Sequence, residues 1–345
     1  MNEVKTGRIT AEEGIALFES AELLDVGLAA DALCRRLHPE SYRTYVVDRN
    51  INYTNICISK CKFCAFWRDA DSPEAYMLSD EEIHAKIAEA VELGATQILM
   101  QGGLHPGLNI AYFERLFRSI KERFGVHLHS LSPPEIVHIS RVSGLSVEQT
   151  IGRLRDAGLD SLPGGGAEIL YDARRRLVSP GKCTADEWIE VMETAQLLGM
   201  PTTATMMFGQ GESYAERIEH LLRIRELQDR TGGFTAFIPW TFQPENTALG
   251  GQPVGGYDYL RTLAISRLFL DNFENIRASW VTQGPKIGQV ALHFGANDLG
   301  STMIEENVVA AAGAKFRMSE EDIRRAISEA GYEPRRRDTY YRHVE

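Results

Sequence analysis

Long hydrophobic runs are missing from this chain of 345 residues. No stretch of about 18 uninterrupted apolar residues occurs, which argues against a membrane-spanning helix, and residues 1–10 lack the apolar core of a signal peptide. We therefore expect a cytoplasmic protein. Hydrophobic residues still make up 43% of the chain, which is enough to bury the large core of a globular enzyme.

An excess of positive charge is also missing. The formal net charge of −11 argues against a general surface for nucleic acid or for anionic membranes. Two short arginine clusters, at residues 174–176 and 335–337, are exceptions. Such short clusters are more typical of a solvated helix face or a chain end than of a binding patch.

Cysteine is scarce, with five residues in the whole chain. This odd number does not indicate a disulfide framework, and reduced thiols in a cytoplasmic protein indicate metal binding or catalysis instead. Cys34 and Cys183 stand alone and are expected to be inert buried thiols. The other three, Cys57, Cys61 and Cys64, crowd into one short segment.

Short apolar runs alternate with amphipathic helices along most of the chain. Residues 10–37 predict two short helices, and capping boxes predict helix starts at Thr10, Ser79, Ser146 and Thr184. The repeat of apolar run, polar or glycine-rich loop and helix is typical of βα units. The candidate strands are residues 46–56, 96–101, 126–131, 159–162, 202–208, 234–239, 275–281 and 290–294.

Eight such runs favour a closed barrel over an open sheet. We expect an α/β protein with a (β/α)8 TIM-type barrel at residues 46–300 and an N-terminal helical cap at residues 1–45. Residues 301–345, with a helix at 320–330, are expected to form a C-terminal helical extension packed on the barrel. The chemistry of such a barrel lies at the carboxyl ends of its strands. The loops expected there are residues 57–64, 101–103, 163–168 and 209–212.

The three crowded cysteines predict a metal centre. Each thiolate can bind one iron of a cubane cluster, which leaves the fourth iron without a protein ligand. A structural zinc site usually needs four ligands and a second cysteine pair, which the sequence lacks. Cys34 or Cys183 as a fourth ligand would complete a zinc site or a closed electron-transfer cluster. The spacing favours the open cluster.

The segment from Cys57 to Cys64 matches the CxxxCxΦC motif and so resembles the radical S-adenosylmethionine (SAM) superfamily, with Phe63 as the aromatic residue before the third cysteine. The resemblance implies a 4Fe-4S cluster held by Cys57, Cys61 and Cys64. It also implies that SAM chelates the open iron and is cleaved to a 5′-deoxyadenosyl radical.

Weaker motifs agree with this resemblance. Gly102 and Gly103 follow a predicted strand where the family places a turn whose backbone binds the methionine amino group. Glu168 resembles the polar residue that holds the ribose hydroxyls in the family. Met207 replaces the isoleucine that packs on adenine, in a segment where Thr205 replaces a glycine.

Four further segments, residues 47–57, 163–168, 232–246 and 293–307, resemble the cyclic dehypoxanthine futalosine synthase family of the futalosine route to menaquinone. The sequence Asn-Tyr-Thr-Asn at 52–55 favours this family over aminofutalosine synthase, which usually has Asn-Pro-Thr-Asn. Aminofutalosine synthase and the transferases of FO-synthase type stay as alternatives. A non-catalytic iron–sulfur protein is a remote one, because it would leave the glycine turn unexplained.

The resemblance implies a radical oxidation. The radical takes hydrogen from C4′ of the ribose of dehypoxanthine futalosine, and the carbon radical adds to the benzoate ring. Loss of one electron and one proton then restores aromaticity. The implied partners are this small-molecule substrate and an electron donor such as flavodoxin or ferredoxin, with no nucleic acid and no membrane.

The proton acceptor is open in the sequence. His127 and His129 alternate along a predicted strand and therefore face the same side. His129 and Asp298 are the candidate catalytic residues, with Glu168 as a rival.

Two residues are candidates for substrate binding. The benzoate carboxylate needs a local cation or a backbone donor, and Arg68, just after the cysteine segment, is the candidate. Trp240 is the candidate for the apolar wall of the cavity. Other aromatic residues that could line it are Phe234, Phe237 and Phe242.

Overall fold

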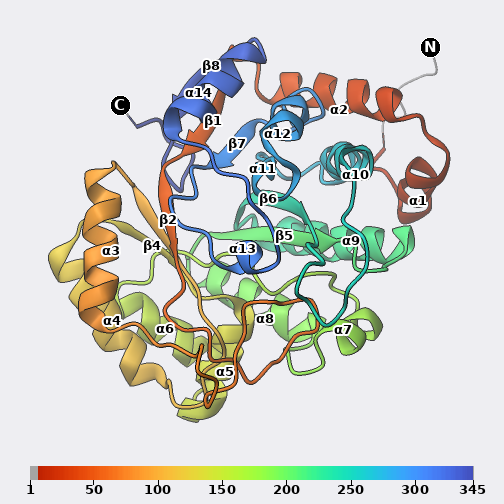
Figure 1. Ribbon diagram of the computed structural model, residues 1–345. Coiled ribbons are helices and arrows are strands. Elements are labelled where there is room, and N and C mark those ends of the chain that lie inside the picture. Colours follow the sequence, from red (N-terminus) through yellow and green to blue (C-terminus); the bar gives the residue numbers. More distant parts are fainter. Residues whose placement is uncertain (1–6, 345) are drawn as a thin grey trace.

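The computed structural model describes residues 7–344 (Figure 1). The chain begins with the two helices predicted for the cap, α1 (Ala11–Ser20) and α2 (Leu23–Leu37). They pack on α9 (Tyr214–Thr231) and α10 (Gly256–Phe269), respectively. No helix among the described residues is long and apolar enough to cross a membrane. Residues 1–6 of the predicted cap, and residue 345, lie outside the described residues.

Most helices lie on the outside of the strands (Figure 1). The capping boxes predicted at Thr10, Ser79, Ser146 and Thr184 are confirmed. In each box the hydroxyl accepts from the backbone N–H three residues later, and the Glu or Gln there accepts from the cap N–H in return. The remaining helices are α3 (Asp80–Glu92), α4 (Ile110–Arg123), α5 (Pro133–Ser143), α6 (Val147–Ala157), α7 (Asp172–Val178), α8 (Ala185–Leu197), α11 (Trp280–Gln283), α12 (Pro285–Ala291), α13 (Val308–Ala311) and α14 (Glu320–Glu329).

The strands pair in parallel, as βα units require. They form three sheets, in the orders β7-β1-β8, β2-β3-β4 and β5-β6. Their bounds are β1 (Tyr42–Val46), β2 (Asp48–Ile51), β3 (Gln97–Met100), β4 (His127–Ser130), β5 (Thr202–Phe208), β6 (Phe234–Thr241), β7 (Asp298–Ser301) and β8 (Glu333–Arg336). The fold is therefore α/β, but these three sheets are not joined by ladders into a closed barrel.

Two predicted strands are reduced to isolated bridges, and the prediction of a third strand is wrong. Residues 159–162 and 275–281 contribute only isolated parallel bridges, such as those of Ser161 with His129 and of Ile276 with Phe237. Residues 290–294 are the end of α12 and the turn after it. Pro285 opens this helix, where its fixed backbone is favourable. A short apolar run does not by itself distinguish a strand from a buried helix end, and β7 is the strand that pairs with β1.

The C-terminal segment covers the amino ends of several strands. The guanidinium of Arg337 donates two hydrogen bonds, of 2.5 and 3.0 Å, to the carboxylate of Asp298, the first residue of β7. The Thr339 hydroxyl donates to Gln97, the first residue of β3, at 2.5 Å. Burial alone would raise the pKa of Asp298, but the charge and hydrogen bonds of Arg337 hold this pKa below its ordinary value. The predicted role of Asp298 as proton acceptor is not supported. Its carboxylate is occupied by the ion pair with Arg337, and it does not line the cavity that holds the three clustered cysteines.

Replacement of Asp298 by alanine is expected to destabilise the protein by about 3–5 kcal/mol, because it leaves the buried Arg337 guanidinium without a counterion. The denaturant midpoint measures the loss. The control is Arg230→Ala, which removes an exposed ion pair with Glu193 and should cost at most about 1 kcal/mol. Equal shifts in the two variants would contradict the importance of the Asp298–Arg337 pair.

Candidate functional site

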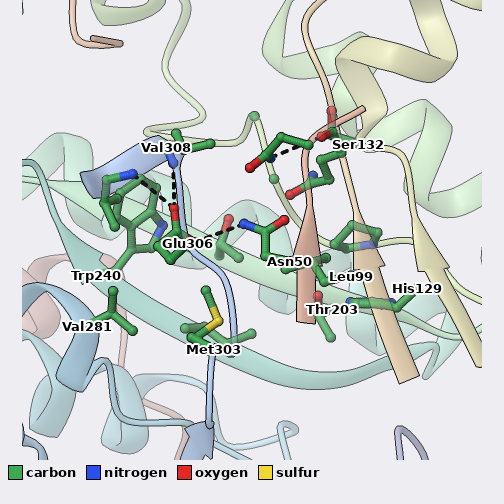
Figure 2. A pocket seen from close by; sticks show the side chains of 18 of the residues that line it. Asn50, Leu99, His129, Ser132, Thr203, Trp240, Val281, Met303, Glu306 and Val308 are labelled. Carbon is green, nitrogen blue, oxygen red and sulfur yellow. Dashed lines mark hydrogen bonds between the residues drawn. The ribbon is translucent and has the colours of Figure 1, made fainter. Parts of the chain in front are cut away.

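A cavity of about 370 Å³ collects most of the predicted site residues. Its lining includes the three clustered cysteines and residues from the loops after β2, β3 and residue 162. Figure 2 shows part of this lining, with Trp240 and Met303 on one side of the view and His129 on the other. The predicted residues that line it are Cys57, Cys61, Phe63, Cys64, Gly102, Gly103, His129, Glu168 and Trp240. Met207, Asp298 and Arg68 do not line it.

The cysteine thiols sit among hydrogen-bond donors. The Leu104 N–H donates to the Cys57 sulfur at 3.3 Å, and the Ser59 hydroxyl lies 3.3 Å from the Cys61 sulfur. Burial raises the pKa of Cys61 to about 11 and also raises that of Cys64. These two thiols therefore stay protonated at neutral pH in the free protein, and metal binding must release their protons.

The donor set fits a cluster with one open iron. Cys34 and Cys183 are both buried and neither lines the cavity, so this site offers three thiols without a fourth. Within residues 7–344, no three His, Cys, Asp or Glu side chains are grouped to hold a single metal ion. Three thiols beside an open cavity match a 4Fe-4S cluster that keeps room for an exogenous ligand.

The turn at Gly102 and Gly103 requires glycine at both positions. A Cβ at Gly102 would lie 2.5 Å from the Tyr53 ring, and one at Gly103 would lie 2.2 Å from the Ile56 carbonyl oxygen. Both distances are too short for any side chain, so only bare backbone allows this approach.

Glu135, which the sequence did not single out, fixes this turn. Its carboxylate accepts from the Gly102 N–H at 3.0 Å and from the Tyr53 hydroxyl at 2.7 Å. The N–H and hydroxyl of Ser132 also donate to it. Burial raises the pKa of Glu135 even though these donors favour the ionised form. The sequence Ser132-Pro-Pro-Glu135 is a capping box that could have identified Glu135 as a helix-start residue, but only the folded structure reveals its contact with Gly102.

Glu168 presents one free carboxylate oxygen. Its Oε1 accepts from the Lys182 ammonium at 2.5 Å, whereas the buried Oε2 has no partner among the described residues. The backbone of Glu168 has φ +41°, a strained conformation for a residue other than glycine. Such a buried acceptor beside the cavity suits a ligand hydroxyl.

Lys182 is another residue that the sequence did not identify. Its ammonium lies 4.9 Å from the centre of the Phe63 ring and lines the cavity. Burial alone would lower its pKa, but Glu168 and Cys61 outweigh burial and raise the pKa above its ordinary value. Lys182 therefore holds Glu168 and Phe63 in place as a permanent cation.

The predicted contact of Met207 with the nucleotide is not supported by its position. Met207 is buried and does not line the cavity, whereas Thr203 and Thr205 of the same strand do. The Thr205 hydroxyl donates to the Gly164 carbonyl at 2.6 Å. Phe234, Phe237 and Phe242 are likewise core residues outside the lining.

Arg68 braces the cysteine loop and does not face the cavity. Its guanidinium pairs with Glu74 at 2.5 Å and donates to the carbonyls of Ala65 and Trp67. A different guanidinium, that of Arg277, lines the cavity. Within residues 7–344 its nearest charged partner is Asp298, at 4.0 Å, and it makes no hydrogen bond to another side chain. Arg277 is therefore the cation available to a ligand.

His129 also reaches the cavity. Its Nδ1 lies 2.6 Å from the Ser161 hydroxyl. Burial, with the charges of Arg277 and Arg337 nearby, lowers the pKa of His129 well below its ordinary value. The imidazole is therefore neutral at neutral pH, which is the form that accepts a proton.

Replacement of Gly103 by alanine is expected to abolish cluster assembly, because the added methyl would displace Ile56 and Cys57. Iron and labile sulfide per chain after anaerobic reconstitution measure this loss. Gly125→Ala is the matched control, since its Cβ would meet nothing within 4 Å. Normal iron content in the Gly103 variant would show that the cysteine loop does not depend on this close approach.

Comparison with known families covers both halves of the chain. The Radical SAM superfamily matches residues 51–224, and the CofH/MqnC C-terminal region matches residues 231–345. Among solved structures, methylornithine synthase (PylB) superposes with a TM-score of 0.74 at 19% identity, over 96% of this chain and 95% of that chain. The hydrogenase maturase HydG of Carboxydothermus hydrogenoformans gives 0.72 at 16% identity, over 97% and 78%. These two likenesses concern the fold.

Curated relatives are much more similar in sequence. The chain is 49% identical to the cyclic dehypoxanthine futalosine synthase of Halalkalibacterium halodurans, over 97% of this chain and 91% of the relative. It is 48% identical to the Streptomyces coelicolor enzyme of the same name, over 98% and 86%. A 5-amino-6-(D-ribitylamino)uracil–L-tyrosine 4-hydroxyphenyl transferase of Archaeoglobus fulgidus is 44% identical, over 90% and 91%. The chain belongs to the radical SAM superfamily and, within it, to the family of the cyclic dehypoxanthine futalosine synthases.

Proposed function

We propose that this protein is a radical SAM oxidoreductase that converts dehypoxanthine futalosine to cyclic dehypoxanthine futalosine in menaquinone biosynthesis. Sequence identity of 49% and 48% to two enzymes of that name, over 97% and 98% of this chain, supports the substrate and the reaction. The single structural observation that carries the proposal is one cavity that holds three thiols, a glycine turn and a buried carboxylate with a free oxygen.

The chain's own residues would hold the cofactors. Cys57, Cys61 and Cys64 would bind the 4Fe-4S cluster, the turn at Gly102–Gly103 the methionine moiety of SAM, and Glu168 Oε2 a ribose hydroxyl. When bound, the cluster and SAM supply a 5′-deoxyadenosyl radical. The protein must exclude water and stray hydrogen donors around such a species.

Arg277 and His129 would act on the substrate. The open guanidinium of Arg277 suits the benzoate carboxylate, in place of Arg68. Neutral His129 would accept the proton that the ring loses. Trp240, with Val281 and Met303 beside it in Figure 2, would supply the apolar wall.

We also propose that the strands complete the barrel predicted from the sequence. Val47 alone separates β1 from β2, so one extended segment contributes to two sheets. Parallel single-pair bridges lie between the ladders and support a ring: His129–Ser161, Leu162–Thr202, Phe237–Ile276 and Arg277–Asp298. The pairing of β8 with β1 supports a C-terminal extension packed on that ring.

The electron donor would be a small one-electron carrier such as flavodoxin or ferredoxin. Ile58, in the cysteine loop, is 52% exposed, and Lys60 beside it is half exposed. Lys60 is paired with the half-exposed Asp69, so the charge there is balanced, and the exposed Ile58 is the feature that suits docking of a carrier close to the cluster.

Product analysis tests the proposed reaction. Anaerobically reconstituted protein, given dithionite, SAM and dehypoxanthine futalosine, is expected to form 5′-deoxyadenosine and a product lighter by two hydrogen atoms, seen by mass spectrometry. An adenosyl adduct would instead identify an aminofutalosine synthase. Transfer of the tyrosine side chain to 5-amino-6-(D-ribitylamino)uracil would identify the activity named for the Archaeoglobus fulgidus relative.

Replacement of Arg277 by glutamine is expected to raise KM about 10- to 100-fold with a smaller change in kcat, because a charge-assisted hydrogen bond contributes about 1.5–3 kcal/mol. Steady-state kinetics of product formation measure the split. Arg115→Gln, which removes an exposed ion pair with Asp80, is the control. A large rise in KM for Arg68→Gln, and none for Arg277→Gln, would reverse the assignment.

A further inference from the structure

We propose that His129, Ser161 and His127 form a proton relay that carries the proton lost by the substrate ring from the cavity to the outer surface near the amino end of β4. This inference rests on the proposed function, because it supplies the exit for the proton that cyclisation releases. It adds Ser161 and His127 to the reaction as residues that act through His129.

The relay is continuous in hydrogen-bond geometry. The Ser161 hydroxyl lies 2.6 Å from Nδ1 of His129 and 2.7 Å from Nε2 of His127. His127 and His129 alternate on β4, so their side chains face the same side. Ser161 forms the parallel bridge to His129 on the neighbouring segment, which sets its hydroxyl between the two rings.

The two ends of the relay lie in different surroundings: His129 faces the cavity, and His127 lies toward the protein surface. His129 is 7% exposed and lines the cavity, and Figure 2 shows its ring at the cavity wall. Ser161 is 1% exposed. His127 does not line the cavity, is only partly buried, and packs edge-on against the exposed ring of Tyr340. A proton that crosses Ser161 therefore leaves the cavity.

The charged groups around His129 and His127 favour transfer of the proton from His129 outward to His127. Arg277, Arg337 and His127 all disfavour the protonated form of His129. Around His127, the carboxylates of Asp160 and Asp338 favour the protonated form, while Lys121 and Arg342 disfavour it. Burial lowers the pKa of both imidazoles, so both rings are neutral at neutral pH and ready to pass a proton on.

The proton balance closes without any additional reactant. The ring radical formed by the new carbon–carbon bond gives one electron to a one-electron acceptor of the iron–sulfur class and one proton to Nε2 of His129. Nδ1–H of His129 passes its proton to the Ser161 oxygen, whose own proton passes to Nε2 of His127. Nδ1 of His127 then releases a proton to solvent. Both imidazoles, now protonated at Nε2, return to their Nδ1–H tautomers before the next turnover.

The decisive variant is His127→Gln. A glutamine amide can keep the hydrogen bond that Nε2 makes to Ser161, but it cannot relay a proton. We expect 5′-deoxyadenosine to form at the wild-type rate in a single turnover, while cyclised product per 5′-deoxyadenosine falls at least about tenfold. The control is Ser130→Ala, which removes another buried β4 hydroxyl, bonded to the Met100 carbonyl, and should leave this ratio unchanged.

Ser161 gives a second, independent pair of variants. Ser161→Ala breaks the relay and should uncouple the two products as His127→Gln does, whereas Ser161→Thr keeps the hydroxyl and should restore coupling. A wild-type ratio in both His127→Gln and Ser161→Ala would overturn the relay. An equal loss of 5′-deoxyadenosine and product would overturn it too, because it would indicate a purely structural role. Absence of cyclised product from the wild-type protein would instead refute the proposed function.

Discussion

The close approach of the cysteine loop to the glycine turn is the contact on which the site depends. β2 and β3 pair in parallel, with Ile51 opposite Met100, so their following loops leave the same edge of the sheet. The Gly103 N–H then donates to the Thr54 carbonyl at 2.9 Å. The Leu104 N–H donates to the Cys57 sulfur. One backbone contact therefore places the Cys57 thiol and the glycine turn side by side, and any side chain on that turn would separate them.

The buried carboxylates discussed above are of two kinds: closed ones, whose oxygens accept hydrogen bonds from the protein, and an open one, which keeps an oxygen available to a ligand. Asp298 is closed by two hydrogen bonds from Arg337 and one from Thr44, and Glu135 is closed by its own set of donors. Glu168 keeps one oxygen without a partner in residues 7–344, which costs about 1–3 kcal/mol when such an acceptor is buried. That cost, together with its strained backbone, is typical of a residue kept for a ligand and not for folding.

Motifs that are local in sequence were predictable, and contacts between distant segments were not. The three cysteines and the capping boxes each depend on residues a few positions apart, so their spacing indicated them, and the resemblance to the radical SAM superfamily pointed to the glycine turn. Lys182 reaches Glu168 because the segment between them, which contains α7, folds back on itself. The Asp298 carboxylate is paired with Arg337, which directly follows β8. The interpretation of residues 290–294 as a strand was wrong for a similar reason, because a short apolar run is compatible with either a strand or a helix end.

The two guanidiniums that line the cavity show how the fold decides which charge stays available. Arg337 is held on both sides, by the Asp298 carboxylate and by the Tyr341 ring 3.9 Å away. Arg277 approaches the same carboxylate only to 4.0 Å, because Arg337 already occupies it. Gly300 makes the space that Arg277 needs, since a Cβ there would lie 2.6 Å from its Nε. The Asp298–Arg337 ion pair at the amino ends of the strands thus also leaves the Arg277 guanidinium facing the cavity. One carboxylate therefore contributes to stability and to the position of the cation that we propose for the substrate carboxylate.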